Sequence, residues 1–434
     1  QVDLIFATPV DELRPLALRA LQQLEGRVRE HSIGGKCDVV QITQMLSKIG
    51  GYEGFHVCID GLLGMSFSPP LREPIAALIA GVNAFEAIDL RAAVDLPSGT
   101  GDDVLEGSRT YATGVVKKPV LAGIADCGRV RYVDLGFFQT RHGRAVRSEE
   151  AILTDAVLDP MRRLRPAAVD KRAFGHLFIV GGSAFMPGAL LMTVKAAVRS
   201  GVGLVTAFAP NSVAGALAAQ VPEAMWIPWP ETFNGTLNPR AMSLLFNRLS
   251  HASAVLVGPG MGLGRGSELI TQQIVRHVNL PVLLDADALS LRAMEVVQRR
   301  RADYGPVVIT PHMGEFMRIT KLPEPNNSVE AALGFSLAYH VVTVLKGANT
   351  RISDGESVIY STQGGPVLSR GGSGDVLSGL IGGMIAQKNK YLPTAVARAV
   401  MLHGMAAQRL ARAKGQVAVN TTQILDYLPE VLRG

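Results

Sequence analysis

The sequence predicts an α/β protein of two consecutive domains, each with a mainly parallel β-sheet between layers of helices. Short apolar runs alternate with helical patterns over residues 1–138 and again from Phe174 onward, as in parallel sheets flanked by helices. Residues 139–172 lose this alternation and collect arginines, so we place the domain connection there. Many of the 46 glycines directly follow apolar runs, where they suit tight βα turns. We expect one domain over residues 1–145 and another over residues 150–434.

The first domain opens on an apolar segment. Its strands are expected over residues 2–6, 55–60, 92–95 and 129–134, and its helices over residues 11–24, 42–48 and 71–83. Because Gln1 runs straight into the first of these strands, we expect residues upstream of it to be missing.

The second domain has the stronger patterns. Strands are expected over residues 177–180, 203–208, 254–258, 281–285, 306–310 and 341–345, and long helices over residues 189–200, 374–384 and 393–413. No period of 20–50 residues repeats, so a solenoid is not expected.

The composition is that of a folded and rather apolar globular protein. Hydrophobic residues make up 47% of the 434 positions and charged residues 18%. No apolar run reaches the ~18–20 residues that span a bilayer, and residues 1–20 lack the basic start of a secretory signal. Cys37, Cys58 and Cys127 form no CxxC pair, which argues against a zinc site or disulfide framework and favours a reducing cytoplasm.

The net charge of +6 raises the question of nucleic acid. Aromatic residues are only 6% and the basic residues are dispersed rather than striped, which argues against that class of partner. We expect a soluble cytoplasmic enzyme with anionic ligands, no nucleic-acid or membrane partner, and a homo-oligomeric state.

The most informative segment for chemistry is Gly371-Gly-Ser-Gly-Asp375, which opens an apolar helix. A glycine-rich turn at a helix N-terminus presents free N–H groups and the positive end of the helix dipole to an anion. The carboxylate of Asp375 would then stand beside that anion, where a base could activate an attacking hydroxyl. From this segment alone, a helix-capping role for Asp375 is about as probable as a catalytic one.

Four other segments follow expected strands of the second domain. Each has a plainer explanation: Lys346-Gly-Ala-Asn-Thr350 as a turn, His312 with Glu315 as a solvated loop, Gly258-Pro-Gly-Met-Gly262 as a tight turn, and Asp285-Ala-Asp287 as helix caps. Together they lie at the sheet edge where open α/β sheets bind ligands. The chain has neither a Walker loop nor a GxGxxG fingerprint, so any phosphate binding follows another pattern.

Taken in order, these segments resemble the NAD(P)HX dehydratase branch of the ribokinase-like superfamily over residues 170–434. The matching pieces are Phe174-Gly-His176, Ile179-Val-Gly-Gly-Ser183, Pro187-Gly-Ala189, GPGMG, LLDADAL, TPHMGEF, TVLKGANT and GGSGDVLSG. The resemblance implies a ribokinase-like three-layer α/β/α fold and the ADP- or ATP-dependent dehydration, with Mg²⁺, of hydrated NADH or NADPH. The fusion of two domains is more typical of the bacterial members, which generally use ADP. The sequence does not decide between ADP and ATP as the phosphoryl donor.

The same resemblance assigns roles to residues of the second domain. It implies that Asp375 is the catalytic base and also contacts the substrate, and that Glu315 organises magnesium and water. The nucleotide contacts would be Lys346, Gly347, Ala348, Asn349, Thr350 and Gly374, and the substrate contacts Ala189, Gly262 and His312.

In the first domain, Asp60 and Asp95 each end an expected buried strand, and Pro97 and Gly99 force a turn that exposes Asp95 with Ser98. For each aspartate taken alone, a helix-capping role is favoured over a functional one by about two to one. With Leu71-Arg-Glu-Pro74 and the segment from Thr113 to Lys117, they resemble the NAD(P)HX epimerase domain, which implies a Rossmann-like three-layer fold. By that resemblance Asp60 and Ser98 bind K⁺, Asp95 acts at C6 of the substrate, and the substrate is lined by Gly64, Met65, Ser66, Phe67, Ser68, Pro69 and Pro70.

Two departures from the epimerase pattern lead to a further expectation. No Asn-Asn-Gly-Gly-Asp motif is present, and Gly64-Met-Ser-Phe67 stands where the family has Gly-Thr-Gly-Leu. We expect a partial first domain with an impaired epimerase.

Two alternatives stay open at this point. The second domain could be a kinase of a small vitamin-type alcohol that releases a stable phosphorylated product. The chain could also be a catalytically inert nucleotide-binding or interaction module, an explanation that fits the first domain better than the second.

Overall fold

The structure is a computed structural model that describes residues 1–24, 26–33, 37–64, 67–102, 104–122, 127–321, 329–387 and 391–433. The chain forms two compact units, Gln1–Val146 and Arg147–Gly434.

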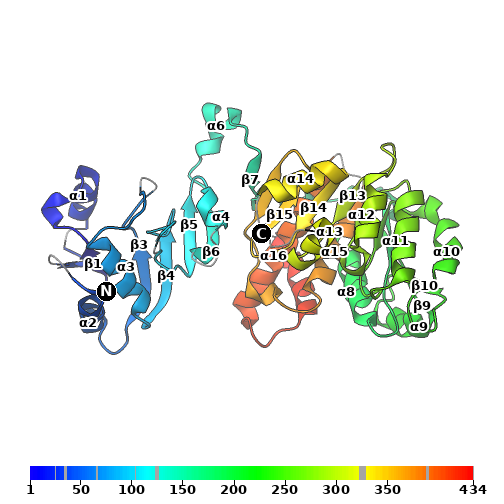
Figure 1. The fold of residues 1–434 in the computed structure, drawn as a ribbon, viewed down its shortest axis with the longest axis horizontal. Helices are drawn as coiled ribbons and strands as arrows, with labels where there is room; N and C mark the ends of the chain where they lie inside the picture. Colours follow the sequence, from blue (N-terminus) through cyan, green and yellow to red (C-terminus); the bar gives the residue numbers. More distant parts are fainter. Residues whose placement is uncertain are drawn as a thin grey trace. The chain divides into compact units, whose positions relative to one another are not determined.

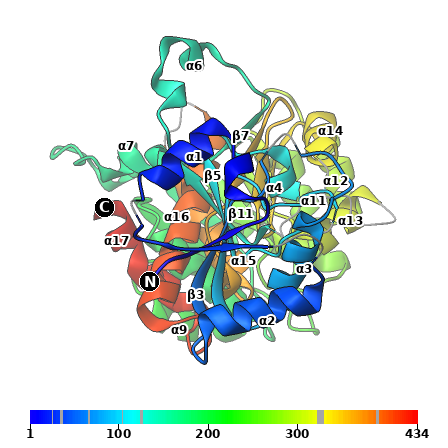
Figure 2. The same ribbon diagram turned by 90° about the vertical axis from the view of Figure 1, so that its left-hand side faces the viewer.

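The first unit contains a four-stranded parallel sheet whose strands lie side by side in chain order. They are β3 (Phe55–Asp60), β4 (Ile88–Val94), β5 (Arg109–Thr113) and β6 (Arg129–Val133). A separate parallel pair joins β1 (Asp3–Phe6) to β2 (Arg29–Ser32). Figure 2 shows α2 (Val39–Gly50) and α3 (Ile75–Ala84) side by side, and both contribute to the apolar core of this unit.

Most expected elements of the first unit are present, with two differences that have local causes. The helix expected over residues 11–24 is divided into a short 3₁₀ helix, Val10–Glu12, and α1 (Pro15–Gln22), because Pro15 suits only the start of a helix. The strands β2 and β5 were not predicted, since Arg29–Ser32 is mostly polar and Arg109–Thr113 buries only alternate residues. A short helix, α4 (Lys118–Ala122), and α6 (Arg141–Ala145) complete the unit.

The second unit is built on a ten-stranded sheet (Figure 1). Its strand order is β10 (Met225–Trp229), β9 (Leu204–Pro210), β8 (His176–Val180), β11 (Ala254–Val257), β12 (Val282–Leu284), β13 (Val307–Ile309), β14 (Val341–Leu345), β15 (Thr350–Ser353), β16 (Val358–Ser361) and β7 (Glu150–Ile152). The first seven strands run parallel to one another, β15 is antiparallel to both neighbours, and β7 is parallel to β16.

Two apolar cores cover the two faces of this sheet. Along β8, Leu177 and Ile179 belong to one core while Phe178 and Val180 belong to the other, because side chains alternate across a strand. The first core is completed by α8 (Pro187–Val198), α9 (Asn211–Gln220), α15 (Ser373–Ile385), α16 (Leu392–Lys414) and α17 (Leu428–Arg433). The second is completed by α10 (Ser243–Phe246), α11 (Arg265–His277), α12 (Leu291–Gln298), α13 (Met313–Thr320) and α14 (Val329–Tyr339), which gives three layers (Figure 1).

The strands of this sheet that the sequence did not predict are β10 at one edge and, towards the other edge, β15, β16 and the edge strand β7. β15 and β16 form an antiparallel meander with polar residues inside the strands, so they lack the continuous apolar run of a central parallel strand. β7 lies within the arginine-rich connection and is only three residues long. Tyr360 on β16 donates to Glu150 on β7 at 2.9 Å, a bond that helps to fix this edge.

Two further observations bear on the chemistry of the chain. In the part of the chain that is described, no helix has the length and apolarity that crossing a membrane requires. Cys37, Cys58 and Cys127 are free thiols.

Candidate active sites

The polar segments of the second unit follow neighbouring parallel strands. β11, β12, β13 and β14 run in the same direction and in register, so their carboxyl ends lie in one row. For the site, we call this row of strand ends, and not an outer strand, the edge of the sheet. The residues that come directly after them are Gly258, Asp285, Thr310 and Lys346. The fold therefore brings four loops to the edge where open α/β sheets bind ligands.

Lys346 lies at the centre of this edge. Its Nζ is 3.2 Å from Asp285 Oδ1 and 3.6 Å from Glu315 Oε2. Thr310 Oγ1 donates to the same Asp285 oxygen at 2.7 Å, and Asp285 is 1% exposed. Burial acts to lower the pKa of Lys346, but the surrounding carboxylates outweigh it and raise that pKa above its usual value. Lys346 is therefore a fixed positive charge at the sheet edge.

The glycine-rich turn before α15 approaches this lysine closely. Gly372 is the N-cap of α15 and has a φ of 87°, which favours glycine, and no side chain caps the helix there. A Cβ on Gly374 would lie 3.3 Å from Lys346 Nζ, so any larger residue would crowd the ammonium. The free N–H groups of the first turn and the ammonium together form an anion-binding corner.

Asp375 lies in the first turn of α15 beside that corner. Burial raises the pKa of its carboxyl, the negative charges of Asp285, Asp287 and Glu315 add to the effect, Lys346 opposes it, and the result is a pKa of about 6. A carboxyl that titrates near neutral pH is suited to accept a proton from a reacting group.

The helix-capping explanation for Asp375 does not fit this arrangement. The N-cap position belongs to Gly372, and no hydrogen bond to the Asp375 carboxylate occurs within the described residues. A charge in the first helical turn still gains from the helix dipole, by up to about 2 kcal/mol at partly buried positions.

His312 and Glu315 form a capping box at the start of α13. The His312 N–H donates to Glu315 Oε2 at 2.8 Å, and the Glu315 N–H donates to His312 Nδ1 at 3.2 Å. A β-bridge also pairs His312 with Lys346. The His312 side chain remains 60% exposed, so the structure holds its backbone at the site and leaves its ring open to a ligand.

The Gly258–Gly262 loop joins the remaining predicted substrate residues to this centre. The Gly262 N–H donates to Asp287 Oδ2 at 2.9 Å, and burial raises the pKa of Asp287. A Cβ on Gly260 would lie 3.0 Å from the Ala189 Cβ, so the loop lies directly against the start of α8. Ala189, Gly262 and Asp287 thus continue the corner formed by Lys346.

The turn that follows Lys346 is compact. Thr350 Oγ1 donates to the Gly347 carbonyl at 3.2 Å, and Asn349 is buried, while Gly347 and Ala348 are exposed. In this structure Thr350 bonds within the turn and Asn349 is buried in it, and their contact with a nucleotide stays a prediction.

Asp285, Asp287 and Thr310 are site residues to which the sequence assigned no role, and Asp285 and Thr310 are in direct contact. Both lie at the ends of buried strands, and Thr310 and Lys346 bind the same carboxylate oxygen of Asp285. An aspartate at the end of a parallel strand could have indicated that Asp285 belongs to the site. Its pairing with Lys346 could not be predicted, because Lys346 is 61 residues away in the chain.

The corner carries more negative than positive charge. Four carboxylates, those of Asp285, Asp287, Glu315 and Asp375, act on the same region as the ammonium of Lys346. Within the described residues, no group of three or more His, Cys, Asp or Glu side chains is arranged to hold a metal ion. Mg²⁺ usually binds one or two carboxylates together with water and substrate phosphates, so these residues fit an ion that arrives with a nucleotide.

In the first unit, Asp60 and Ser98 are in direct contact. Asp60 is 3% exposed and accepts hydrogen bonds from the Ser98 N–H at 2.7 Å, the Ser98 hydroxyl at 2.6 Å and the Leu62 N–H at 3.2 Å. No cationic side chain pairs with Asp60 among the residues described. A buried carboxylate with only dipolar partners, next to a hydroxyl oxygen, suits a monovalent cation.

Asp95 occupies a turn after β4 in an unusual conformation. Its φ of 75° is rare for a residue with a side chain, and such a backbone costs about 1–3 kcal/mol unless its surroundings enforce it. Its carboxylate forms an ion pair with Lys117 and accepts a hydrogen bond from Thr113 Oγ1 at 3.0 Å. Backbone strain of this kind is concentrated at functional sites.

The loop predicted to line the substrate of the first unit begins beside Ser98. The Leu63 N–H donates to Ser98 Oγ at 2.9 Å, and Phe67 N–H to the Gly64 carbonyl at 3.1 Å. Gly64, Ser68, Pro69 and Pro70 are exposed. Met65 and Ser66 lie outside the described residues.

Comparison with known families matches both units. Residues 177–430 match the family described as NAD(P)H-hydrate dehydratase. Residues 1–117 match the family described as the YjeF-related protein N-terminus. The chain is 33% identical to the bifunctional NAD(P)H-hydrate repair enzyme Nnr of Moorella thermoacetica over 86% of this chain and 72% of the relative. It is also 33% identical to that of Gloeobacter violaceus over 97% of this chain and 82% of the relative.

Solved structures match the second unit. A ribokinase-like superfamily protein of Enterococcus faecalis aligns with a TM-score of 0.57 and 28% identity over 66% of this chain and 97% of that protein. The ADP/ATP-dependent NAD(P)H-hydrate dehydratase of Bacillus subtilis, crystallised with ATP and Mg²⁺, aligns with a TM-score of 0.54 and 27% identity over 65% of this chain and 97% of that protein. The ribokinase-like fold expected for the second domain is confirmed.

Proposed function

The chain belongs to the family of bifunctional NAD(P)H-hydrate repair enzymes, and on this premise we propose that its second unit dehydrates the 6S hydrate of NADH or NADPH with ADP or ATP as phosphoryl donor. The observation that carries the proposal is Asp375, a carboxyl with a pKa of about 6 beside the anion-binding corner of Lys346 and Gly374. A nucleotide-binding module without chemistry would gain nothing from a raised pKa there.

The proposed reaction has two steps. Asp375 takes the proton of the C6 hydroxyl as that oxygen attacks the terminal phosphorus of the nucleotide, whose bridging P–O bond breaks. The C6–O bond of the phosphate ester then breaks with loss of a proton from C5, which restores the dihydropyridine and releases phosphate. Phosphorylation is needed because water is a poor leaving group, whereas phosphate leaves readily.

The residues of the corner supply alignment and charge. Lys346 and the N–H groups of the Gly371–Asp375 turn hold phosphate oxygens, since phosphoryl transfer depends mainly on positioning and charge neutralisation. The loops that carry Ala189, Gly262 and His312 hold the hydrate. Lys346 also lowers the pKa of Asp375, which keeps part of the base ionised near neutral pH.

Magnesium is part of this proposal. The excess of carboxylates around Lys346 fits it, with Glu315 and Asp285 as the residues that would hold it or its water shell. When bound with the nucleotide, the ion supplies charge neutralisation to the transferring phosphate.

We propose that the first unit contains an epimerase-type site. Asp95, paired with Lys117 and Thr113, is the candidate for proton transfer at the C6 hydroxyl, and Asp60 with Ser98 is the candidate K⁺ site. The impairment expected from the altered Gly64–Phe67 loop stays a prediction because Met65 and Ser66 are not described. The expected homo-oligomer and cellular compartment also stay predictions.

The test is to incubate the pure protein with NADPHX, Mg²⁺ and either ADP or ATP while following absorbance at 340 nm and inorganic phosphate. We expect NADPH, measured by its absorbance at 340 nm, and inorganic phosphate to form in equal molar amounts. A stable phosphorylated product without absorbance at 340 nm would indicate a small-molecule kinase instead, and neither product would indicate a binding module.

A further inference from the structure

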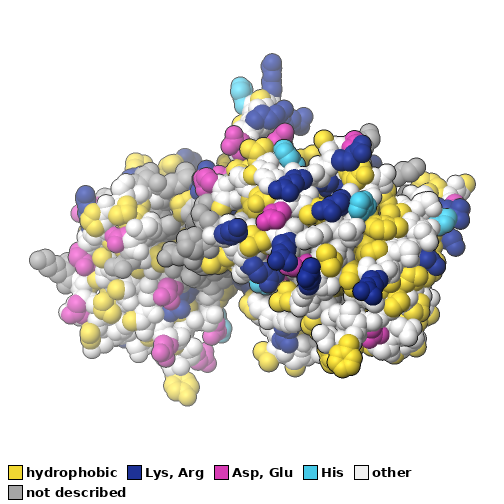
Figure 3. All heavy atoms as spheres, turned by 45° about the vertical axis from the view of Figure 1, so that its right-hand side comes forward, with side chains coloured by type: hydrophobic (Ala, Val, Ile, Leu, Met, Phe, Trp, Pro, Cys, Tyr) yellow, Lys and Arg dark blue, Asp and Glu magenta, His cyan; other side chains and the backbone are white. Residues whose placement is uncertain are grey.

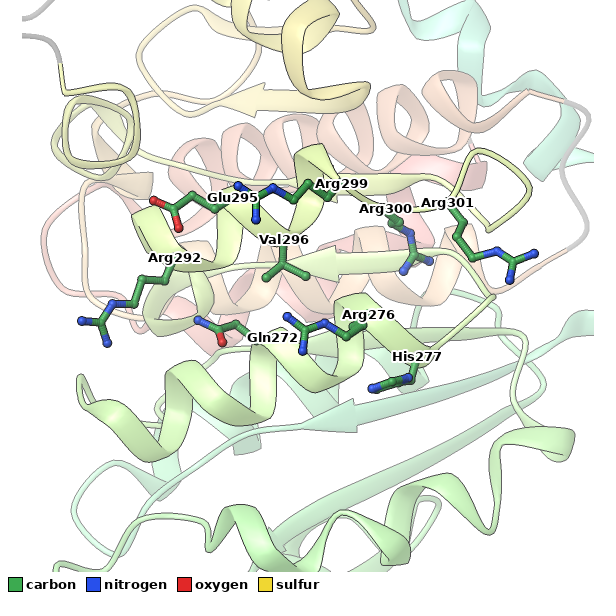
Figure 4. A pocket seen from close by; sticks show the side chains of 9 residues that line it. All are labelled: Gln272, Arg276, His277, Arg292, Glu295, Val296, Arg299, Arg300 and Arg301. Carbon is green, nitrogen blue, oxygen red and sulfur yellow. The ribbon is translucent and has the colours of Figure 1, made fainter.

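A surface hollow of about 490 Å³ lies on the second unit between α11 and α12. Figure 4 shows that Arg276 comes from the last turn of α11, Arg292 from the start of α12, and Arg299, Arg300 and Arg301 from the segment after α12. Lys and Arg side chains also gather on the face of this unit seen in Figure 3. We call this hollow the arginine groove.

One of the five arginines is structural. Arg300 donates to the carbonyls of Val275, Val278, Leu280 and Gly305, at 2.7 Å for Val278 and 2.9 Å for Leu280. Burial lowers the pKa of Arg300 to about 10. These bonds tie the end of α11 to the segment after α12, so Arg300 forms the floor of the groove rather than a free contact for a ligand.

Two others are paired with acidic residues on the surface. Arg301 holds Asp303 through two bonds of 2.9 and 2.8 Å, and Arg292 Nη1 lies 3.2 Å from Glu268 Oε2. The Arg292 and Arg301 side chains are 65% and 67% exposed, so both pairs can rearrange at little cost.

Arg276 and Arg299 have no hydrogen bond or ion pair to their guanidinium groups from any described residue. Of the five arginines that line the hollow, Arg292 and Arg301 extend in opposite directions in Figure 4, and the acidic residues nearby are Glu268, Glu295 and Asp303. Cations do stabilise helix C-termini, and Arg276 and Arg299 lie at such ends. Arg292 lies at the start of α12, where a cation opposes the dipole, and its partner there is Glu268.

We propose that the arginine groove binds a small molecule with a di- or triphosphate chain, at a site separate from the candidate active site. The groove is lined by Gln272, Arg276 and His277 of α11 and by residues between Arg292 and Arg301 in and after α12, and none of the candidate active-site residues lines it. A guanidinium group can donate two parallel hydrogen bonds to phosphate oxygens, and two unpaired arginines, one in the last turn of α11 and one directly after α12, suit a ligand with several phosphates. The volume falls in the range of about 300–1,000 Å³ that is typical of small-molecule sites.

The test measures binding of inorganic triphosphate, without Mg²⁺, by calorimetry to the full chain. We expect Arg276→Glu/Arg299→Glu to weaken one binding event by at least about tenfold, the scale of losing charged hydrogen bonds. The milder Arg276→Gln/Arg299→Gln should weaken it in the same direction, which guards against misfolding. The matched control is Arg412→Glu/Lys414→Glu, which reverses two exposed charges at the C-terminal end of α16 and should leave binding unchanged.

Three results would overturn the proposal. Loss of all triphosphate binding in Lys346→Ala, with none lost in the arginine variants, would assign the binding to the candidate active site. Equal weakening in the Arg412/Lys414 control would mean nonspecific attraction. Tighter, arginine-dependent binding of a single-stranded 20-nucleotide DNA than of triphosphate would mean that the occupant is a nucleic acid.

Discussion

The two units both place an aspartate at the carboxyl-end edge of a parallel sheet, but they balance its charge in opposite ways. In the first unit Asp95 has its own cation, Lys117, and a hydroxyl from Thr113. In the second unit Asp375 shares the single ammonium of Lys346 with other carboxylates, and its pKa rises to about 6. The second site therefore has more carboxylates than cationic side chains, which suits a proton-accepting base and a bound cation. The first site holds a carboxylate that is already paired with a lysine, in a strained turn.

The largest effect that this comparison predicts is on turnover in the second unit. Asp375→Asn removes the base and keeps the shape, so we expect nucleotide affinity to change little and the dehydration rate to fall by about 10²–10⁴-fold. Stopped-flow absorbance at 340 nm with NADPHX and ADP measures the rate. Asp303→Asn, an exposed acid on the same unit, is the control; near-normal turnover in Asp375→Asn would leave only a dipole role for the carboxylate.

The second prediction concerns the first unit. A mixture of both epimers of NADPHX should be converted only to the level of the S fraction, because the Gly64–Phe67 loop departs from the epimerase pattern. Restoring it with Met65→Thr, Ser66→Gly and Phe67→Leu should accelerate consumption of the R fraction by about 10²-fold, the usual gain from correct positioning.

The spontaneous interconversion of the epimers without protein is the baseline for this experiment. Full conversion of the R fraction by the unmodified chain would show that the loop is functional as it stands. Failure of the restored loop, with dehydration of the S form intact, would place the defect elsewhere in the first unit.

How far the sequence predicts the two sites depends on the kind of contact. The Gly371–Asp375 turn and the strand ends were predictable because phosphate loops and buried parallel strands are continuous in sequence. The pairing of Asp285 with Lys346 was not, because it depends on the register of β12, β13 and β14. The arginine groove was missed for the same reason, since it joins the ends of two helices only after folding.

The elements that were missed have a common physical cause. β5, β15 and β16 carry polar side chains within the strand, mostly half-buried in β5 and mostly buried in β15 and β16, so their strand character comes from hydrogen-bonded neighbours rather than from apolar runs. The helix expected over residues 11–24 shows the opposite error, because an apolar periodic pattern continued across Pro15.

The third prediction tests the shared cation of the second unit. Lys346→Ala leaves Asp285 and Glu315 without their buried partner, so we expect the second unit to lose about 3 kcal/mol of stability. It also removes the charge that lowers the pKa of Asp375, so the pH at which dehydration becomes half-maximal should rise above that of the wild type.

Calorimetry and a pH–rate profile measure these two effects on the same variant. Lys171→Ala, at an exposed lysine of the same unit, is the matched control and should change neither. A rise in the nucleotide KM without either effect would mean that Lys346 acts only as a ligand contact, as the sequence alone suggested.

The smallest predicted effect concerns the pH dependence of stability. It distinguishes a carboxylate surrounded by other carboxylates from one that is paired with a cation. The folded pKa of Asp375 lies near 6, above its ordinary value of 3.8, so the folded state binds more protons than the unfolded state between these values. Stability of the second unit therefore falls as pH rises from about 4 to 6 and stays lower above it. Asp375→Asn removes this penalty, so the variant should be more stable than the wild type at pH 8 by about 1–3 kcal/mol.

The measurement is the difference in unfolding midpoint between Asp375→Asn and the wild type, without ligands, at pH 4 and pH 8. Taking the difference at each pH cancels titrating groups that do not interact with Asp375, and the gain should appear at pH 8 and be much smaller at pH 4. In Asp303→Asn the sign should be reversed, since the hydrogen bond from Arg301 lowers the pKa of Asp303. An equal gain in stability at both pH values would mean that Asp375→Asn improves packing. It would also mean that burial and the neighbouring carboxylates do not raise the pKa of Asp375.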